Sequence, residues 1–448
     1  MTSVSPPTVV AAPGGVPLLG HALRLRRNPL VFLEQLRDLG DIAVFRLGPQ
    51  RAYLLNDPGL VHQVLVEDSG HYTKGILFEK GRQLLGNGLA TSEGAFHGRQ
   101  RRLVQPAFGR GDVHGYAGVM ADRSHAVANG WRHGQVITLD REMARLTSTI
   151  ATRCLFATDI AHADARQVEQ HMATVFDGAA RRAYAPVGLW YRLPTIGNRR
   201  FGAALRLLHD LVDRIVAGYQ RDGVRSDDVL STLLAARDDA TGQRMTDQQV
   251  HDEVITILAG GTETVAAALT WTFHLLARHP EVEAQLHEEL ATVLRGRLPG
   301  HADIAALPYL GAVAQESLRL YPPVWLLPRT PAADVRLGGL AVPAGAQVFF
   351  SPYALHRDQR WFPEPHRFDP GRWLTGDARA TSRGAYLPFG LGRRNCVGGS
   401  FAITELVIVL ATVAARWTLR PVPGTTPTVA ALTTLRLDGL AMTTLERT

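Results

Sequence analysis

The feature that most constrains the fold is a long apolar segment from Thr246 to His279, TDQQVHDEVITILAGGTETVAAALTWTFHLLARH. Thr246 and Gln249 have the spacing of a helical capping box, and Pro280 ends the helical pattern. At 1.5 Å per residue such a helix is about 50 Å long, enough to cross a whole domain. Because the segment is mainly apolar on all sides, we expect it to be a buried central helix.

The rest of the chain predicts a mainly α fold with a small β subdomain. Residues 41–56 alternate apolar and polar side chains around Gly-Pro-Gln, which is typical of a β-hairpin. Most of 58–321 has helical periodicity, including a helix over 308–320 that ends before two prolines. Short strands and turns follow, and then an apolar helix over 397–417. We expect residues 1–12 to be disordered and residues 13–448 to form a single domain.

Composition excludes several classes of function. The chain has 448 residues, of which 46% are hydrophobic and 20% charged, so it can bury a large core. The formal net charge is +7, but Lys74 and Lys80 are the only lysines, and the arginines are scattered among acids. This argues against a nucleic-acid-binding surface. The N-terminal residues lack the charged start of a signal peptide, and the longest apolar stretch, 401–415, contains Glu405 and is short for a membrane span. We expect a soluble, cytoplasmic protein with no membrane anchor.

Gly260 and Gly261, two residues that disfavour helix, lie in the middle of the predicted central helix. Each glycine costs roughly 1 kcal/mol relative to alanine in a helix interior, and the polar residues Thr262, Glu263 and Thr264 follow directly. One interpretation is close helix packing at the glycines beside a satisfied polar cluster. The other is a widened helix that admits a small ligand, with an acid and an alcohol that relay protons.

The loop Phe389–Gly399, FGLGRRNCVGG, places one of only two cysteines among glycines and arginines. A disulfide between Cys154 and Cys396 and an ordinary buried cysteine are the simplest alternatives. However, Cys396 directly precedes an apolar helix, whose N-terminal N–H groups favour a thiolate. The loop lacks the third glycine of a dinucleotide motif, and the chain has no C-x-x-C or H-E-x-x-H. A single cysteine without neighbouring ligands suits one axial ligand to a cofactor.

Four motifs, in order, resemble those of the cytochrome P450 family. Phe389-x-x-Gly392-x-Arg394-x-Cys396-x-Gly398 is similar to its haem-binding loop. Gly260–Thr264 resembles its oxygen-binding groove, and Glu316-x-x-Arg319 and the segment of Arg367 resemble its Glu–Arg–Arg network. The resemblance covers nearly the whole chain. It implies the cytochrome P450 fold, with haem between the long central helix and the helix that follows the cysteine loop.

The resemblance also implies a role for each matching residue. Cys396 is the axial thiolate ligand of the iron of haem b, and Glu263 and Thr264 deliver protons during O2 activation. Glu316, Arg319 and Arg367 are structural. The remaining matches contact the haem ring or bind its propionates, and they are Phe389, Gly392, Gly398, His97, Arg101, Arg329 and Arg394.

The implied function is a haem-thiolate monooxygenase that hydroxylates or epoxidises a small hydrophobic substrate with O2. Electrons from NAD(P)H would come through a ferredoxin and its reductase, which dock near Arg393 and Arg394. A peroxide-driven peroxygenase and a non-catalytic haem-binding protein are the alternatives, and the Glu263–Thr264 pair argues against both.

An apolar set of residues predicts the substrate class. These pocket candidates carry no fixed charge, which favours a hydrocarbon-like substrate, a terpene ahead of a fatty acid or polyketide, in specialised metabolism. They are Ile76, Phe78, Trp190, Leu258, Val324, Trp325 and Leu326.

Overall fold

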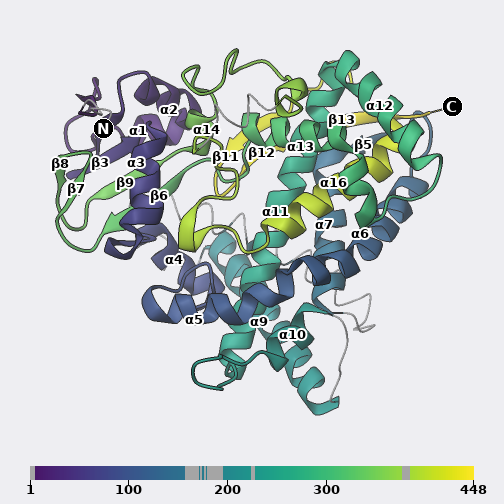
Figure 1. The fold of residues 1–448 in the computed structure, drawn as a ribbon, viewed down its shortest axis with the longest axis horizontal. Coiled ribbons are helices and arrows are strands. Elements are labelled where there is room, and N and C mark those ends of the chain that lie inside the picture. Colours follow the sequence, from purple (N-terminus) through teal and green to yellow (C-terminus); the bar gives the residue numbers. More distant parts are fainter. Residues whose placement is uncertain are drawn as a thin grey trace. The chain divides into compact units, whose positions relative to one another are not determined.

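The computed structural model describes residues 6–156, 171, 174–175, 178, 195–222, 228–375 and 384–447 (Figure 1). The chain groups into two compact units where the sequence predicted a single domain. The first unit is Met1–Lys80 with Leu318–Cys396, and the second is Gly81–Ser317 with Val397–Thr448. Each unit is therefore assembled from two separate stretches of chain.

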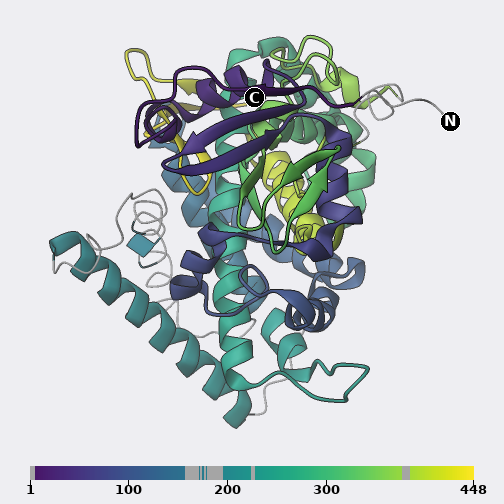
Figure 2. The ribbon, with the colours of Figure 1, turned by 90° about the vertical axis from the view of Figure 1, so that its left-hand side faces the viewer.

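The first unit is built on a six-stranded sheet, counted over its described residues, with strand order β1-β2-β3-β9-β6-β4. Figure 2 shows the hairpin of β2 and β3 beside the later strands of this sheet. The strands are β1 (Val9–Ala11), β2 (Ile42–Leu47), β3 (Gln50–Leu55), β4 (Tyr72–Thr73), β6 (Leu327–Pro331) and β9 (Gln347–Phe350), with β7 (Val335–Leu337) and β8 (Leu340–Val342) forming a separate pair.

Short helices surround this sheet and close its hydrophobic core. The core joins alternate residues of β2, β3 and β9, among them Ile42, Tyr53 and Val348, to the helical segment 58–67. The helical elements are α1 (Ala22–Arg27), α2 (Pro29–Arg37), α3 (Pro58–His62), η1 (Gln63–Glu67), η2 (Ser69–His71), α14 (Pro352–Leu355), η6 (Pro370–Trp373) and η7 (Gly392–Arg394), while α4 (Ile76–Leu85) and α13 (Pro308–Leu320) cross the unit boundary.

Two predictions about this unit have clear outcomes. The β-hairpin is confirmed, because β2 and β3 pair antiparallel from Ile42↔Leu55 to Leu47↔Gln50. The prediction of disorder over residues 1–12 is wrong for β1, which pairs in parallel with β2. The Thr8 amide and hydroxyl both donate to Asp41, so a tertiary contact fixes a segment whose own sequence has no strand pattern.

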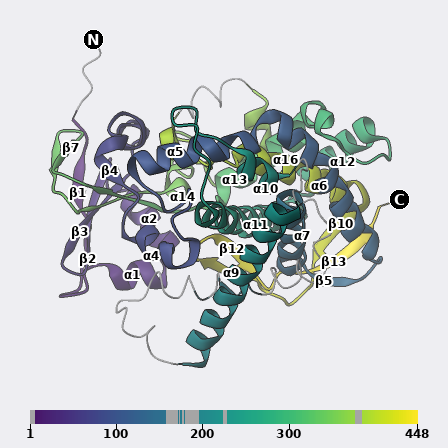
Figure 3. The same cartoon turned by 90° about the horizontal axis from the view of Figure 1, so that it is seen from below.

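The second unit is mainly helical around α11 (Asp247–Arg278), and Figure 3 shows α9 running obliquely to α11. Helix α7 packs along α11, and α16 packs on α6. Its other helical elements are α5 (Gly94–Val104), η3 (Gln105–Phe108), α6 (Arg110–Gly130), α7 (Leu139–Leu155), α9 (Ile196–Asp222), α10 (Val229–Ala235), α12 (Pro280–Leu294), η5 (His301–Ala306) and α16 (Gly399–Arg416).

Two small sheets complete the described part of the second unit, with strand orders β10-β13-β5 and β11-β12. The Trp271 indole N–H on α11 donates to the Leu435 carbonyl, which ties the second of these sheets to the central helix. The strands are β5 (Val136–Thr138), β10 (Trp417–Pro421), β11 (Thr428–Ala431), β12 (Leu435–Asp438) and β13 (Ala441–Glu446).

The central helix forms as its sequence predicts. The Thr246 hydroxyl accepts from the Gln249 amide, and the Gln249 side chain accepts from the Thr246 amide, which completes the capping box. Among the described helices, α11 and α16 are long and apolar enough to span a membrane. Of their most apolar windows, 61% and 67% are buried inside the protein, as in the core helices of soluble proteins that pass the same test.

Candidate active site

The cysteine loop is a tight turn in the first unit that leads directly into α16. The Cys396 amide donates to the Phe389 carbonyl at 2.8 Å, closing the loop. Gly392 has φ +71°, and a Cβ at this position would lie 2.2 Å from the Leu65 carbonyl oxygen. Only glycine allows this close approach of the loop to η1.

One side chain of the loop is held by a neighbouring segment, and others are exposed. The Arg394 guanidinium donates to the Ser69 carbonyl at 3.2 Å, while Arg393 and Cys396 are exposed. Gly398 has an ordinary backbone conformation, and a Cβ there would lie 3.8 Å from Phe108, an ordinary contact. Protein packing therefore explains Gly392 but gives no reason for glycine at 398.

The two cysteines occupy opposite environments, and no disulfide joins them. Cys154 is buried on α7, where burial, followed by the nearby Glu405, raises the pKa of its thiol well above the ordinary value. Cys154 is thus held as a neutral thiol, which is a poor metal ligand. Of the two, Cys396 alone is exposed enough to bind a cofactor.

The two glycines of α11 have different surroundings. A Cβ at Gly261 would meet Ala151 of α7 at 3.9 Å, whereas a Cβ at Gly260 would meet no protein atom within 4 Å. Gly260 is exposed although most of α11 is buried. The packing interpretation therefore fits Gly261, and the ligand-groove interpretation fits Gly260.

The hydroxyl groups beside the glycines bond back to their own helix. Thr264 Oγ1 donates to the Gly260 carbonyl at 2.6 Å, and Thr262 Oγ1 donates to the Leu258 carbonyl at 2.9 Å. The Thr262 carbonyl accepts from Thr147 of α7 at 3.0 Å. Helix α11 is continuous through this region, so the structure has no break at the glycines. Thr264 instead bonds to the carbonyl of the exposed Gly260.

Glu263 is held by residues that the sequence analysis did not identify. Its Oε1 accepts from Arg436 at 2.6 Å and from the Thr434 hydroxyl at 2.7 Å, and both partners lie at or beside β12. Burial lowers the pKa of Arg436, but Glu263 and Asp438 raise it overall. A charged arginine thus stabilises the Glu263 carboxylate within the largely buried interior.

The predicted cationic pair His97 and Arg101 lies on one face of α5, four residues apart. His97 is buried and Arg101 is partly exposed. Gln100, on the same helix, donates to the fully buried Glu253 of α11 at 2.9 Å. This contact fixes α5 against the central helix and so positions His97 and Arg101 within the second unit.

Arg329 is a buried cation in the sheet of the first unit. It lies on β6, is 5% exposed, and stacks over the Phe350 ring with 5.6 Å between the guanidinium carbon and the ring centroid. A buried guanidinium is costly unless an anion or several acceptors satisfy it. The Arg329 guanidinium donates to the Pro328 carbonyl at 2.8 Å, and its role as a haem-propionate ligand stays a prediction.

Glu316 and Arg319 are both fully buried on α13. The Arg319 guanidinium donates to the carbonyls of His356, Pro365 and Arg367 at 2.7 to 3.0 Å. Arg367 differs from the prediction, because its own guanidinium forms an exposed ion pair with Glu364 at 3.0 Å. Arg367 enters the network through its backbone oxygen, which the tight turn around it turns towards Arg319.

His356 extends this buried network of the first unit. Its Nδ1 lies 3.1 Å from the Arg319 carbonyl, and its Nε2 accepts from the Leu387 amide at 2.8 Å. This arrangement requires the neutral ring with its proton on Nδ1. Burial, followed by the Arg319 charge, lowers the pKa of His356 to about 3.

The pocket candidates differ in burial. Trp325 and Leu258 are fully buried, Val324, Leu326 and Phe78 are partly buried, and Ile76 is 54% exposed. Trp190 lies outside the described residues. The assignment of these apolar residues to a substrate pocket stays a prediction.

The donor set fits a haem with one thiolate ligand. No group of three or more His, Cys, Asp or Glu that could hold a metal ion occurs among the described residues. The first unit instead offers the exposed Cys396 beside Arg394, and the second offers the exposed Gly260 with His97 and Arg101. An exposed cysteine is what a single axial thiolate ligand requires, and arginine side chains are groups that bind carboxylates.

Comparison with known proteins decides the family. The family described as Cytochrome P450 matches residues 11–444. The chain belongs to the cytochrome P450 family. It is 47% identical to "Cyclooctatin synthase" of Streptomyces melanosporofaciens over 92% of this chain and 90% of that protein. It is 45% identical to "Cyclooctat-9-en-7-ol 5-monooxygenase" of the same organism, covering 94% and 92%, and 41% identical to "Pentalenene oxygenase" of Streptomyces avermitilis, covering 95% and 94%.

Family membership settles the reaction class. The protein is a cytochrome P450 monooxygenase that uses haem and O2. The predicted fold, mainly helical with a small β region, is confirmed. The roles of individual residues, the electron donor and the substrate remain for proposal.

Proposed function

We propose that this cytochrome P450 hydroxylates or epoxidises a cyclic terpene in specialised metabolism in the cytoplasm. The observation that carries the proposal is its 41–47% identity, over at least nine-tenths of each chain, to terpene-modifying monooxygenases. The pocket candidates agree with it, because Phe78, Leu258, Val324 and Leu326 are apolar. An uncharged surface favours a hydrocarbon over a fatty acid, whose carboxylate needs a cation.

Cys396 is the proposed axial ligand. When bound through a thiolate, haem supplies the activation of O2 and the transfer of one oxygen atom to the substrate. The protein's task at this position is to present a sulfur atom that is deprotonated and accessible. The Phe389 carbonyl fixes the Cys396 amide, and α16 begins three residues later, so N–H groups at its start favour the negative sulfur.

The cations hold the two propionates in this proposal. Arg329 and His97 are the buried members, and Arg101 and Arg394 are partly exposed. Because the stacking of Arg329 on Phe350 and the bond of Arg394 to Ser69 already restrict these side chains, binding a carboxylate costs them little further conformational entropy. Loss of any one is expected to weaken haem retention.

Thr264 and Glu263 move protons in this proposal. The Thr264 hydroxyl, which donates to the Gly260 carbonyl, can rotate to donate into the groove that Gly260 exposes. The Glu263 side chain is 12% exposed, so it meets solvent and can pass protons inward. Arg436 and Thr434 keep its carboxylate in one place.

Electrons come from NAD(P)H through a ferredoxin and its reductase in this proposal. Exposed Arg393, beside the cysteine loop, offers a positive charge to an acidic ferredoxin. Arg393→Glu is therefore expected to raise the KM for ferredoxin without changing the spectrum of the enzyme.

Ligand titration tests the substrate class. Purified holoenzyme is titrated with cyclic sesquiterpenes and diterpenes and with straight-chain fatty acids, and the low-spin to high-spin shift is recorded. The expected result is saturable shifts with a cyclic terpene only, followed by one-oxygen products when ferredoxin, reductase and NADPH are added. Tighter binding and turnover of a fatty acid, or faster product formation with peroxide alone, would overturn the proposal.

A further inference from the structure

A turn near the N-terminus of the first unit exposes apolar side chains. In the turn Val16–Gly20, Leu18 is 92% exposed, Leu19 is 50% exposed and Val16 is 48% exposed. Leu18 also has φ +63°, a left-handed conformation that costs a leucine roughly 1–2 kcal/mol. A protein that only needed a turn here would gain stability from glycine or asparagine at this position.

The turn lies against a second locally unfavourable feature. Arg46 and Arg51 are exposed and directly opposite each other on β2 and β3, and like charges so placed repel. The Gly48 amide donates to the Leu19 carbonyl at 3.1 Å. A Cβ on Gly20 would overlap Arg46, so the leucine turn sits directly beside this pair of arginines.

Helix α1 adds further positive charge next to the turn. Arg26 and Arg27 are exposed and form no ion pair within the described residues. Residues 1–33 and 42–56 together contain five arginines and no Asp or Glu. The acidic residues Glu34, Asp38, Asp41 and Asp57 lie just outside these two ranges, so the excess of positive charge is local to them, where it can attract an anionic surface.

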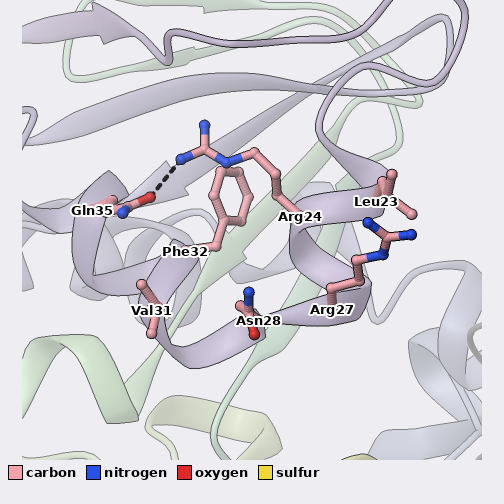
Figure 4. A pocket seen from close by; sticks show the side chains of 7 residues that line it. All are labelled: Leu23, Arg24, Arg27, Asn28, Val31, Phe32 and Gln35. Atoms are coloured by element: carbon pink, nitrogen blue, oxygen red, sulfur yellow. Dashed lines mark hydrogen bonds between the residues drawn. The ribbon is translucent and has the colours of Figure 1, made fainter.

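A hollow of about 310 Å³ lies between α1 and α2 on this part of the unit (Figure 4). Leu23 and Arg27 line one side and Val31 lines the other, while Arg24 lies over the Phe32 ring and donates to Gln35 at 2.5 Å. Leu23 is 38% exposed and Val31 is 54% exposed. Apolar and cationic side chains therefore lie next to one another around this hollow.

We propose that these residues dock the protein on an anionic lipid bilayer surface. The docking face consists of the leucine turn, α1, the start of α2 and the paired arginines, and its members are Val16, Leu18, Leu19, Leu23, Arg24, Arg26, Arg27, Val31, Arg46 and Arg51. Leu18 and Leu19 enter the interface, and the arginines contact lipid phosphates. Protruding leucines flanked by cations match the apolar and anionic layers of a bilayer, and charge complementarity argues against a second copy of this equally basic face.

Vesicle co-sedimentation of the full haem-loaded chain tests the proposal. The probes are phosphatidylcholine vesicles with and without 40% phosphatidylglycerol. We expect binding to the anionic vesicles only, and we expect it to weaken as salt screens the arginines. Leu18→Ser/Leu19→Ser should weaken binding on the order of tenfold, and Arg26→Gln/Arg27→Gln about 25-fold, since each arginine contributes roughly fivefold.

Matched substitutions elsewhere provide the controls. Leu374→Ser changes a leucine that is 49% exposed, like Leu19, and Arg132→Gln/Arg141→Gln removes two exposed arginines of the second unit. Both should bind like the parent protein, and all variants should keep the parent melting temperature and haem spectrum. No binding to anionic vesicles, equal losses in the controls, or a dimer that the leucine substitutions abolish would overturn the proposal. The titration with terpenes is a separate readout, so failure here leaves the proposed function untouched.

Discussion

Replacing Gly392 by alanine tests how the cysteine loop is held. The substitution places a Cβ in a left-handed conformation, φ +71°, which costs roughly 1–2 kcal/mol. It also places that carbon 2.2 Å from the Leu65 carbonyl oxygen. Since this is about 1 Å shorter than ordinary contact, the loop must move away from η1. The bond from the Cys396 amide to the Phe389 carbonyl then weakens, which costs about 1 kcal/mol more.

Two neighbouring glycines of the same loop provide graded controls. Gly390 has φ +69°, but a Cβ there would lie 3.9 Å from Asn395, so alanine should cost only the roughly 1–2 kcal/mol of strain. Gly398 is neither strained nor crowded, so alanine should change stability by no more than about 0.5 kcal/mol, because it also reduces the freedom of the unfolded chain. Gly392→Ala should cost about 3 kcal/mol.

The assay combines urea unfolding with the fraction of protein that retains a normal thiolate-ligated haem spectrum. The expected order of loss in stability against urea is Gly392→Ala, then Gly390→Ala, then Gly398→Ala, and the haem spectrum is compared between Gly392→Ala and Gly390→Ala because Gly398 is itself a proposed haem contact. If Gly392→Ala unfolds at the same urea concentration as Gly398→Ala and keeps its haem spectrum, the contact with Leu65 does not hold the loop and the reasoning fails.

Three further predictions concern buried charges. Arg436→Gln should lower stability by about 1–2 kcal/mol, because its ion pair with Glu263 is largely buried. It should also reduce the product formed per NADPH, because Glu263 is released. An unchanged product yield would contradict the proposed proton route. The pKa of His356 is lowered to about 3, so the contribution of its neutral ring to stability is complete above pH 6.5 and is lost as the pH falls from there towards 3. Urea unfolding should show a loss in the free energy of unfolding of up to about 1.4 kcal/mol per pH unit in this window. His356→Gln should flatten this dependence of stability on pH. Glu405 is fully buried, both its oxygens lack partners in the described structure, and burial raises its pKa. Glu405→Met should therefore be more stable than the parent at pH 7, by a margin that shrinks towards pH 4.5. A loss of stability in this variant at pH 7 would show that the carboxyl has an essential partner.

Features with local signals could be predicted from the sequence. The capping box at Thr246 and the prolines after residues 279 and 321 set helix ends that depend only on neighbouring residues. The structure places α13 at Pro308–Leu320 as predicted. The motif of the cysteine loop is also local, because its residues lie within eleven positions of one another.

Long-range contacts could not be predicted in the same way. Arg436 lies 173 positions from Glu263, and nothing in its strand-like surroundings distinguishes it from other surface arginines. The strand β1 depends on pairing with β2 rather than on its own pattern. For Arg367 the motif predicts membership of the network but not the geometry, in which the guanidinium pairs with Glu364 and the backbone carbonyl accepts from Arg319.

The spectrum of the reduced, carbon monoxide-bound protein tests the central claim most directly. A thiolate ligand predicts a strongly red-shifted Soret band for the parent protein. The band should persist in Cys154→Ala, which removes the buried thiol, and disappear in Cys396→Ala. A band that survives in Cys396→Ala, or that is lost in Cys154→Ala with the fold intact, would contradict the assignment of Cys396 as the haem ligand.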